Sequence, residues 1–376
     1  MRQITIPKEL KIADDYAALL TVIEDLITEN SISKIYIFAG TYASFILGNQ
    51  LAKDLGNSCH IKNCKINYQI VSDQDLLHES DLSQKLDNNW LLAIGGGKVL
   101  DQVKYLAAKT NSKFISVPTL ISHDGICSPV AVLNGKSYGA VMPYALLVPL
   151  FIIKDASTAQ IQSGVGDLIA NLSAIEDWKL ANKYKNEEID SFAAMLSKQS
   201  AMTVISILET QLKLKNQKTN WSKDFIHEEF FLRSLIEALA VSGIAMSISG
   251  NSRPCSGAEH MISHAIDEIY GHGVKASHGI QVLIATLFLE SLRGYDLIKS
   301  IFSSAQDFDL SLDKVDFEKL EYNSILFKLL SELGFPTKFA DIGIDSIELK
   351  KIIQLAPQTR KNRFTILDLF LTSQLS

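Results

Sequence analysis

Three features are scarce or missing in this sequence of 376 residues: basic clusters, paired cysteines and long hydrophobic runs. Lysine and arginine number 36 against 42 aspartate and glutamate residues, which gives a net charge of −6 at pH 7. No stretch concentrates the basic residues or interleaves them with aromatic ones. Because binding to a phosphate backbone needs a dense basic surface, we expect no nucleic-acid partner.

The cysteines and the apolar segments favour an intracellular protein. The four cysteines are scattered and form no C-x-x-C pair, so we expect reduced thiols rather than a disulfide framework. The most apolar run, Tyr144–Ile153, contains Pro149 and is far shorter than the roughly 20 residues of a membrane-spanning helix. Residues 1–15 lack the apolar core and cleavage site of a signal peptide. We therefore expect a soluble, cytoplasmic, globular protein without membrane insertion.

The N-terminal part of the chain alternates between two periodicities. Stretches such as YASFILGNQLAKDLG and KVLDQVKYLAAKT carry apolar residues at helical spacing, and short segments rich in β-branched or aromatic residues separate them. The short segments are predicted to be buried strands over residues 34–39, 66–71, 90–97, 113–119 and 146–153. This alternation predicts right-handed crossovers and a mostly parallel sheet with helices on both faces.

The pattern changes after about Gly164, where apolar residues recur at helical spacing and little resembles a strand. The length of the chain also favours two cores over one. The sequence thus predicts an α/β domain over residues 1–160 and an all-α domain over residues 161–376. In such an arrangement we expect the active site in the cleft between the two domains.

A glycine turn follows one of the predicted strands. Gly95, Gly96 and Gly97 lie at the carboxyl end of that strand and begin the next helix, where open α/β sheets bind ligands. Glycines let the backbone approach a pyrophosphate closely, and the helix N-terminus offers unpaired N–H groups. The pattern GGGKVLD is not the usual G-x-G-x-x-G, so a tight turn without a ligand remains the alternative.

The next strand ends in PTLISHDGICSP, at the same edge of the predicted sheet. Thr119 and Ser122 are small polar residues at this edge, and the loop that contains Asp124 follows them. Asp124 is either an ordinary Asx-turn residue or a carboxylate that accepts a hydrogen bond from a ribose or substrate hydroxyl.

Three segments of the helical half could supply metal ligands. Asp167 lies just inside a predicted helix after a glycine-containing turn, and His278 begins another helix. His260 and His264 are four residues apart and share one helical face. One carboxylate and two imidazoles form a typical catalytic zinc-type site. Taken singly, Asp167 could simply complement a helix dipole and each histidine could be a hydrogen-bonded core residue.

Together these segments resemble the sn-glycerol-1-phosphate dehydrogenase family. The resemblance is carried by GGGKVLDQVKY, SVPTLISHDGICSP, SGVGDLIAN, SGNSRPCSGAEHMISHAID and a later HG, in family order from about Ile35 to about Leu292. This family belongs to a superfamily with iron-containing alcohol dehydrogenase, glycerol dehydrogenase and 3-dehydroquinate synthase. The resemblance implies a Rossmann-like nucleotide-binding domain followed by an all-α metal-binding domain, the dehydroquinate synthase-like fold.

The resemblance further implies a metal-dependent reduction of dihydroxyacetone phosphate to sn-glycerol 1-phosphate with NAD or NADP as hydride carrier. Relatives often carry an aspartate at the end of the first strand, where this chain has Gly40, so the choice between NADH and NADPH stays open. The residues expected beside the dinucleotide, the turn glycines included, are Gly95, Gly96, Gly97, Lys98, Val99, Leu100, Asp101, Thr119, Leu120, Ile121, Ser122 and Ser128.

The resemblance also assigns roles in the metal-binding half. It implies that Asp167, His260 and His278 hold one divalent metal, a choice that spacing alone leaves open. His264 would then face the substrate as the proton-relay group, a task that suits the ordinary imidazole pKa of about 6.5. Asp124 would contact the substrate as a further catalytic residue, and Asp167 would border it. Zinc is the favoured metal, and nickel or iron accepts the same ligands.

The substrate phosphate needs hydrogen-bond donors. Arg253, with Asn251 and Ser252, lies in a loop just before the histidine-bearing helix, and arginine offers bidentate phosphate geometry. The alternative for this loop is helix capping.

Other functions remain open at this stage. A glycerol or polyol dehydrogenase would share the fold and the site, and a 3-dehydroquinate synthase-like enzyme would recycle its NAD. A family member that binds nucleotide without turnover is the non-enzyme alternative. We expect a homo-oligomer, and a small phosphorylated three-carbon compound as the substrate.

Overall fold

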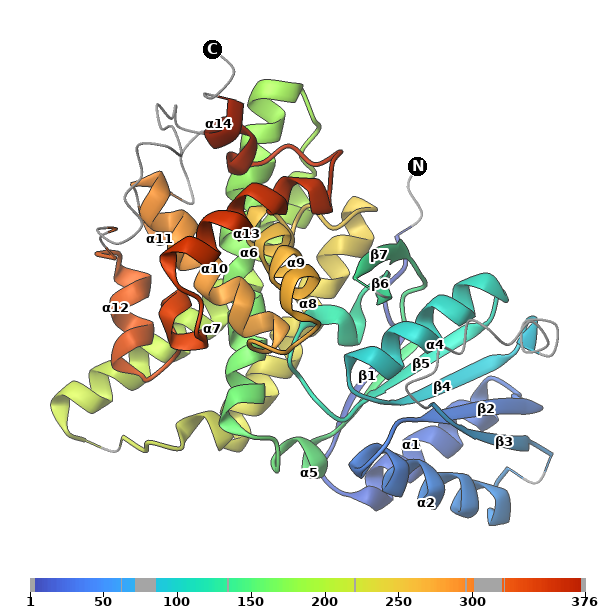
Figure 1. The fold of residues 1–376 in the computed structure, drawn as a ribbon. Helices are drawn as coiled ribbons and strands as arrows, with labels where there is room; N and C mark the ends of the chain where they lie inside the picture. The colour runs from blue at the N-terminus through green and yellow to red at the C-terminus, as the bar shows by residue number, and fades with distance from the viewer. Residues whose placement is uncertain are drawn as a thin grey trace. The chain divides into compact units, whose positions relative to one another are not determined.

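The computed structural model describes residues 4–61, 63–71, 86–133, 135–219, 221–294, 296–300, 320 and 322–372. The chain divides into two compact units, Met1–Ser157 and Thr158–Ser376 (Figure 1). The boundary predicted between residues 160 and 161 falls in the first turn of the long helix that begins the second unit.

The first unit contains a six-stranded parallel sheet with the strand order β1-β8-β5-β4-β2-β3. The five predicted strands are confirmed, and β1 is an additional edge strand that the sequence analysis missed. Its sequence, ELKIA, is only five residues long and includes two charged residues, so it carries no strong strand signal. The strands are β1 (Glu9–Ala13), β2 (Lys34–Ala39), β3 (Lys65–Ile70), β4 (Trp90–Gly95), β5 (Lys113–Pro118) and β8 (Ala145–Pro149).

The last strand of the sheet ends earlier than predicted. It was expected over residues 146–153, but β8 ends at Pro149 and Leu150–Ile153 form the helical turn α5. Proline has no N–H to donate to a neighbouring strand, so it ends the ladder despite the apolar residues that follow.

Helices cover both faces of this sheet (Figure 1). Helices α1 (Tyr16–Glu29) and α2 (Ala43–Asn57) pack their buried leucines and isoleucines on one face. Helix α4 (Gly97–Lys109) packs on the other face, against β4 and β5. Because Leu91 and Leu92 are both fully buried, β4 is apolar on both sides, as expected for a central parallel strand.

A small antiparallel hairpin, β6 (Val130–Leu133) and β7 (Lys136–Gly139), follows the short 3-10 helix η2 (Asp124–Cys127). The hairpin is tied to α4 through Asp101, whose Oδ2 accepts a hydrogen bond from the Val132 N–H at 2.9 Å. This hairpin was not predicted.

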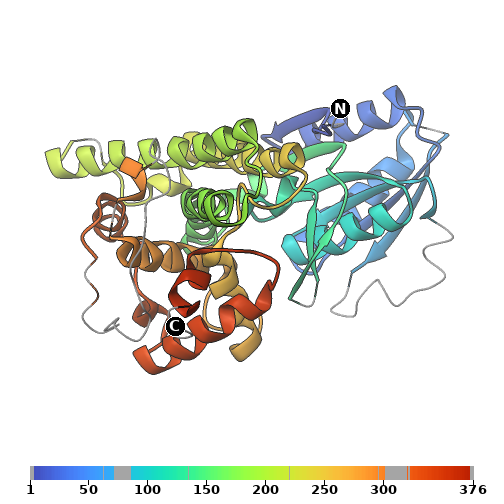
Figure 2. The same ribbon diagram turned by 90° about the horizontal axis from the view of Figure 1, so that it is seen from above.

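The second unit contains no strand among its described residues, which confirms the predicted all-α fold. In both views α9 and α13 lie side by side (Figures 1 and 2). The helices are α6 (Thr158–Lys185), α7 (Ser191–Gln217), η3 (Phe225–His227), α8 (Glu229–Ser249), α9 (Ala258–Tyr270), α10 (His278–Arg293), α11 (Leu297–Ser300), α12 (Ile325–Glu332), η5 (Phe339–Ile342), α13 (Ser346–Thr359) and α14 (Ile366–Thr372).

Two glycines let α6 and α10 approach closely. A Cβ on Gly279 would lie 1.8 Å from the Ser163 carbonyl oxygen, and a Cβ on Gly166 would lie 2.2 Å from the Gly279 oxygen. The sequence had predicted a glycine-containing turn just before Asp167. That prediction is wrong, because Asp167 lies within the continuous helix α6 and the glycine at 166 serves helix packing.

Helix α8 is the one described helix that is long and apolar enough to cross a membrane. Of its apolar window, 67% is buried inside the protein, as in a core helix.

Candidate active site

Asp167, His260 and His278 converge from three different helices, α6, α9 and α10. Their ligand atoms all lie within 4.8 Å of one another. The Nε2 atom of each histidine lies 3.8 Å from Oδ1 of Asp167. The Asp167 side chain is 3% exposed, and those of the histidines are 12% and 23% exposed, so the carboxylate is buried while both imidazoles keep some access to solvent. One carboxylate and two imidazoles around a common point fit a divalent metal such as zinc.

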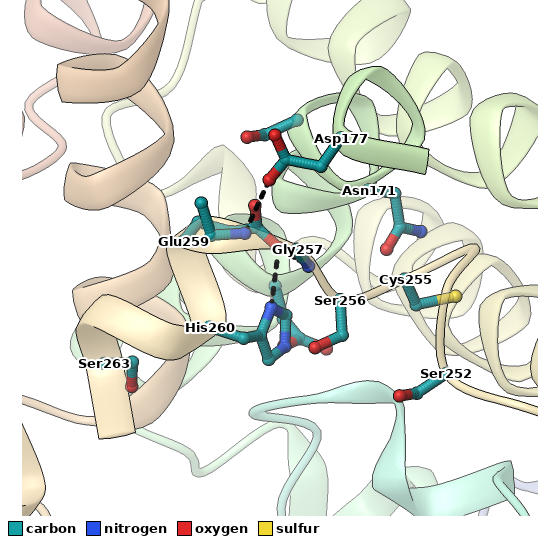
Figure 3. Close-up of polar contacts among 12 residues, drawn as sticks. Asn171, Asp177, Ser252, Cys255, Ser256, Gly257, Glu259, His260 and Ser263 are labelled. Carbon is teal, nitrogen blue, oxygen red and sulfur yellow. Dashed lines mark hydrogen bonds and ion pairs between the residues drawn. The ribbon is translucent and has the colours of Figure 1, made fainter. Parts of the chain in front are cut away.

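The buried carboxylate of Glu259 orients the first of these histidines (Figure 3). Glu259 Oε1 lies 2.9 Å from Nδ1 of His260 and also accepts the Gly257 N–H. Burial raises the pKa of the Glu259 carboxyl, but Oε1 stays the acceptor because the Gly257 N–H already donates to it. The hydrogen of His260 therefore lies on Nδ1, and Nε2 keeps the lone pair that binds metal.

The Ser263 hydroxyl orients His278 in the same way, with the hydrogen on Nδ1. The Ser263 hydroxyl donates to Gln281 Oε1 at 2.6 Å, so the contact of 2.9 Å between Ser263 Oγ and His278 Nδ1 has the imidazole as donor. The Gln281 amide is held in turn by Asp267 Oδ1 at 2.9 Å. Both histidines thus present Nε2 to Asp167, the arrangement that metal-binding imidazoles need.

A buried ion pair supports the start of α9. Asp177 Oδ1 accepts from Arg293 Nη2 at 2.8 Å, and its Oδ2 accepts from the Ala258 N–H at 2.6 Å. Burial raises the pKa of Asp177, while Arg293 acts in the opposite direction. Only glycine fits at position 257, since a Cβ there would lie 2.6 Å from Asp177 Oδ2. This network sets the position from which α9 presents His260.

His264, the predicted proton-relay residue, faces an arginine. Its Nε2 lies 3.0 Å from Nη2 of Arg360, and because arginine only donates, Nε2 is the acceptor and Nδ1 carries the hydrogen. Burial, followed by the charge of Arg360, lowers the pKa of His264 to about 3. The expectation of an ordinary imidazole pKa is therefore wrong, and His264 is neutral at pH 7.

Arg253, expected to bind the substrate phosphate, is engaged within the protein. Its Nε donates to Glu187 Oε1 at 2.7 Å, its Nη2 forms an ion pair with Glu187 Oε2, and its Nη1 donates to the Phe364 carbonyl at 2.9 Å. The residue is 3% exposed. This geometry fits a structural role better than the predicted phosphate contact.

The two predicted nucleotide-binding segments of the first unit lie at one sheet edge. Gly95 pairs with Pro118 across β4 and β5, and the Thr119 N–H donates to the Gly95 carbonyl at 3.0 Å. A Cβ on Gly97 would lie 2.2 Å from the His123 ring, so the turn is closely packed. This edge offers the backbone of Gly96 and Gly97, at the N-terminus of α4, to an anionic ligand.

Several of the other predicted nucleotide residues are buried within this unit. Asp101 forms an ion pair of 2.9 Å with Lys104, a fully buried side chain that also lies 3.4 Å from Ser128 Oγ. Leu100 and Ile121 are 0% and 1% exposed, so only their backbone could border a ligand. Asp124 begins η2, and its role stays a prediction.

The residues around the metal ligands were not predicted from the sequence. Glu259 directly precedes a predicted ligand, which is a local signal that could have indicated it. Arg360 and Arg363 lie about 100 positions further along the chain, in a segment without a recognisable pattern. Their approach to α9 follows from tertiary packing alone.

Comparison with known proteins defines the class. The family model of iron-containing alcohol dehydrogenase matches residues 17–157. A probable glycerol dehydrogenase from Sinorhizobium meliloti shares the fold, with a TM-score of 0.66 and 16% identity over 95% of this chain and 91% of that one. Glycerol dehydrogenase from Schizosaccharomyces pombe has a TM-score of 0.62 and 16% identity, over 100% and 93% of the two chains. The fold is that of the iron-containing alcohol dehydrogenases.

Proteins that are more similar to this chain in sequence identify its family within this class. A glycerol-1-phosphate dehydrogenase [NAD(P)+] from Thermococcus sibiricus is 30% identical over 98% of this chain and 93% of its own length. Its counterpart from Staphylothermus marinus is 37% identical over 73% of this chain and 68% of its own length. The chain belongs to the glycerol-1-phosphate dehydrogenase family, and the resemblance seen in the sequence is confirmed.

Proposed function

We infer that this protein interconverts dihydroxyacetone phosphate and sn-glycerol 1-phosphate, with NAD(P) as hydride carrier and a divalent metal as a second cofactor. The observation that carries this proposal is the convergence of Asp167, His260 and His278 within 4.8 Å. The names of the relatives from Thermococcus sibiricus and Staphylothermus marinus support the substrate and the nucleotide. Zinc is the first candidate metal, and nickel or iron suits the same ligands.

Asp167, His260 and His278 would hold this metal through one carboxylate oxygen and two Nε2 atoms. When bound, a divalent metal polarises the ketone oxygen as a Lewis acid, an effect worth several kcal/mol. Glu259 and Ser263 keep the imidazoles of His260 and His278 in the tautomer that metal binding requires. Neither ring therefore has to change its tautomer when a metal binds.

The first unit would bind the dinucleotide. The backbone at Gly96 and Gly97 and the N-terminus of α4 favour the pyrophosphate through unpaired N–H groups and the helix dipole. Thr119 lies at the same edge, and its Oγ1 contacts Ser44 Oγ at 3.0 Å. Gly40 offers no carboxylate to a ribose, so both NADH and NADPH are candidates.

His264 would hold a proton on Nδ1 and accept a hydrogen bond from Arg360 at Nε2. With a pKa of about 3 it acts as a neutral hydrogen-bonding group at pH 7 rather than as an imidazolium. We propose that the enzyme is cytoplasmic and assembles as a homo-oligomer.

The proposal is tested by following NADH and NADPH absorbance with dihydroxyacetone phosphate, in the presence of zinc or nickel and with a chelator control. Metal-dependent oxidation supports it. Activity with glycerol alone would favour the polyol dehydrogenase alternative instead. Activity that returns the nucleotide unchanged would favour the synthase alternative.

A further inference from the structure

Two arginines from the segment between α13 and α14 meet the loop that precedes α9. Arg360 Nη1 donates to Ser256 Oγ at 2.6 Å. Arg363 Nη1 donates to the carbonyl oxygen of Ser256, and its Nη2 donates to Ser252 Oγ at 2.8 Å. Figure 3 shows Ser252 and Ser256 on the stretch of chain that leads to His260. Two guanidinium groups therefore share one serine as a neighbour.

The positive charge of Arg363 is only partly offset by nearby carboxylates, since Glu259 and Glu187 act on it without a direct ion pair. Arg363 forms no ion pair with a described carboxylate, and its side-chain bonds go to two neutral serine oxygens. The nearby Glu187 is already paired with Arg253. Burial and the charge of Arg360 lower the pKa of Arg363 to about 9, and burial lowers that of Arg360 to about 10. Like charges held together away from water are costly unless an anion joins them.

The location of these groups relates them to the metal ligands. Arg360 Nη2 contacts Nε2 of His264, which lies one turn beyond His260 on the same face of α9. The ring centroid of His264 is 6.2 Å from that of His278. Neither arginine is fully buried as a residue. An anion here would lie next to a ketone or hydroxyl oxygen placed at the metal ligands.

We propose that Arg360 and Arg363, together with the hydroxyls of Ser252 and Ser256, form the subsite for the phosphate group of the substrate. This inference rests on the proposed function. The ligand class is a phosphomonoester, which guanidinium groups bind with parallel, charge-assisted hydrogen bonds. The subsite takes the role that the sequence analysis gave to Arg253 and makes the enzyme select phosphorylated over free trioses.

The test compares Arg363→Gln with the wild-type holoenzyme and with Arg233→Gln as a matched control. Arg233 is a partly exposed arginine on α8 whose Nε pairs with Glu229 at 2.9 Å. Removing a charged hydrogen-bond donor should raise KM for dihydroxyacetone phosphate about tenfold or more. The constants for unphosphorylated dihydroxyacetone and the zinc content should stay unchanged, and the control should match wild type. Arg363→Lys, which keeps the charge without the planar fork, should fall in between.

Binding of inorganic phosphate, measured by calorimetry on the same proteins, separates the two proposals. If wild type binds phosphate and Arg363→Gln does not, the subsite stands even when dihydroxyacetone phosphate is not turned over, and only the proposed substrate fails. An unchanged KM together with unchanged phosphate binding in Arg363→Gln and Arg360→Gln would overturn the subsite.

Discussion

Gly279 and Ser163 touch through their backbones at the crossing of α10 and α6, where a Cβ on the glycine would lie 1.8 Å from the serine carbonyl oxygen. The next residue towards the start of α10 is His278, and Asp167 lies one turn beyond Ser163 on α6. The distance between two metal ligands is therefore set by a contact that only glycine permits.

Gly279→Ala should destabilise the protein by about 3 kcal/mol, because the added methyl group meets backbone that cannot rotate away. It should also weaken zinc binding, since His278 moves with the start of α10. Denaturant unfolding and zinc titration measure the two effects. Gly56→Ala is the control, because nothing lies within 4 Å of its Cβ. Equal stability of the two variants would contradict the proposed role of the helix contact.

Ser263→Ala should lower zinc affinity about 10- to 100-fold, because His278 loses the acceptor that holds its hydrogen on Nδ1. The free energy of unfolding without metal should change far less than the affinity. Competition with a chromophoric chelator measures the affinity. Ser234→Ala, which removes a partly exposed helix serine on α8, should bind zinc like wild type. The same affinity in both variants would show that Ser263 does not orient the histidine.

His264→Ala should keep its zinc and lose most of its turnover, because His264 lies beside His278 but does not belong to the converging ligand group. Metal analysis and steady-state kinetics on one preparation check this. Loss of both zinc and turnover would mean that His264, rather than His260, is a ligand. The pH profile of kcat should show no step near 6.5 that depends on His264, since its pKa is lowered to about 3.

Glu290 should make folding stability fall as pH rises. Burial raises the pKa of this carboxyl to about 7, although Ser324 and the Leu297 N–H donate to it. Because the pKa of Glu290 is higher in the folded than in the unfolded protein, protonated Glu290 stabilises the fold. This stabilisation is complete below the unfolded pKa of about 4.5. It is lost as pH rises through about 7 and amounts to roughly 3 kcal/mol.

Glu290→Gln removes this titration while keeping the shape of the side chain. The variant should therefore gain stability relative to wild type between about pH 5 and pH 8, as measured by denaturant unfolding at each pH. A difference between the two proteins that does not vary with pH would contradict this account.

The sequence predicted the parallel sheet well because its central strands are apolar on both faces, as at Leu91 and Leu92. The edge strand β1 was not predicted because it is only five residues long, includes two charged residues and buries only Ala13. The glycines before Asp167 were predicted to form a turn, because a glycine that permits close helix contact looks the same in sequence as one that ends a helix. The difference is visible only once α10 is in place.

The candidate site could be predicted where its residues lie close together in the sequence. The spacing of His260 and His264 indicated one helical face, but it could not show that Arg360 approaches the second histidine and lowers its pKa. Arg253 had the right chemistry for phosphate, yet its partner Glu187 lies 66 positions away. Contacts over such distances in the chain depend on tertiary packing, which no local pattern encodes.

The central claim is that Asp167, His260 and His278 hold the metal on which reduction of dihydroxyacetone phosphate depends. The most direct measurement determines zinc content and NADH or NADPH oxidation for wild type and His260→Ala side by side, with and without chelator. The account predicts that wild type is active only with its metal and that the variant loses zinc and activity together. Full zinc occupancy in His260→Ala, or wild-type activity that survives chelation, would contradict it.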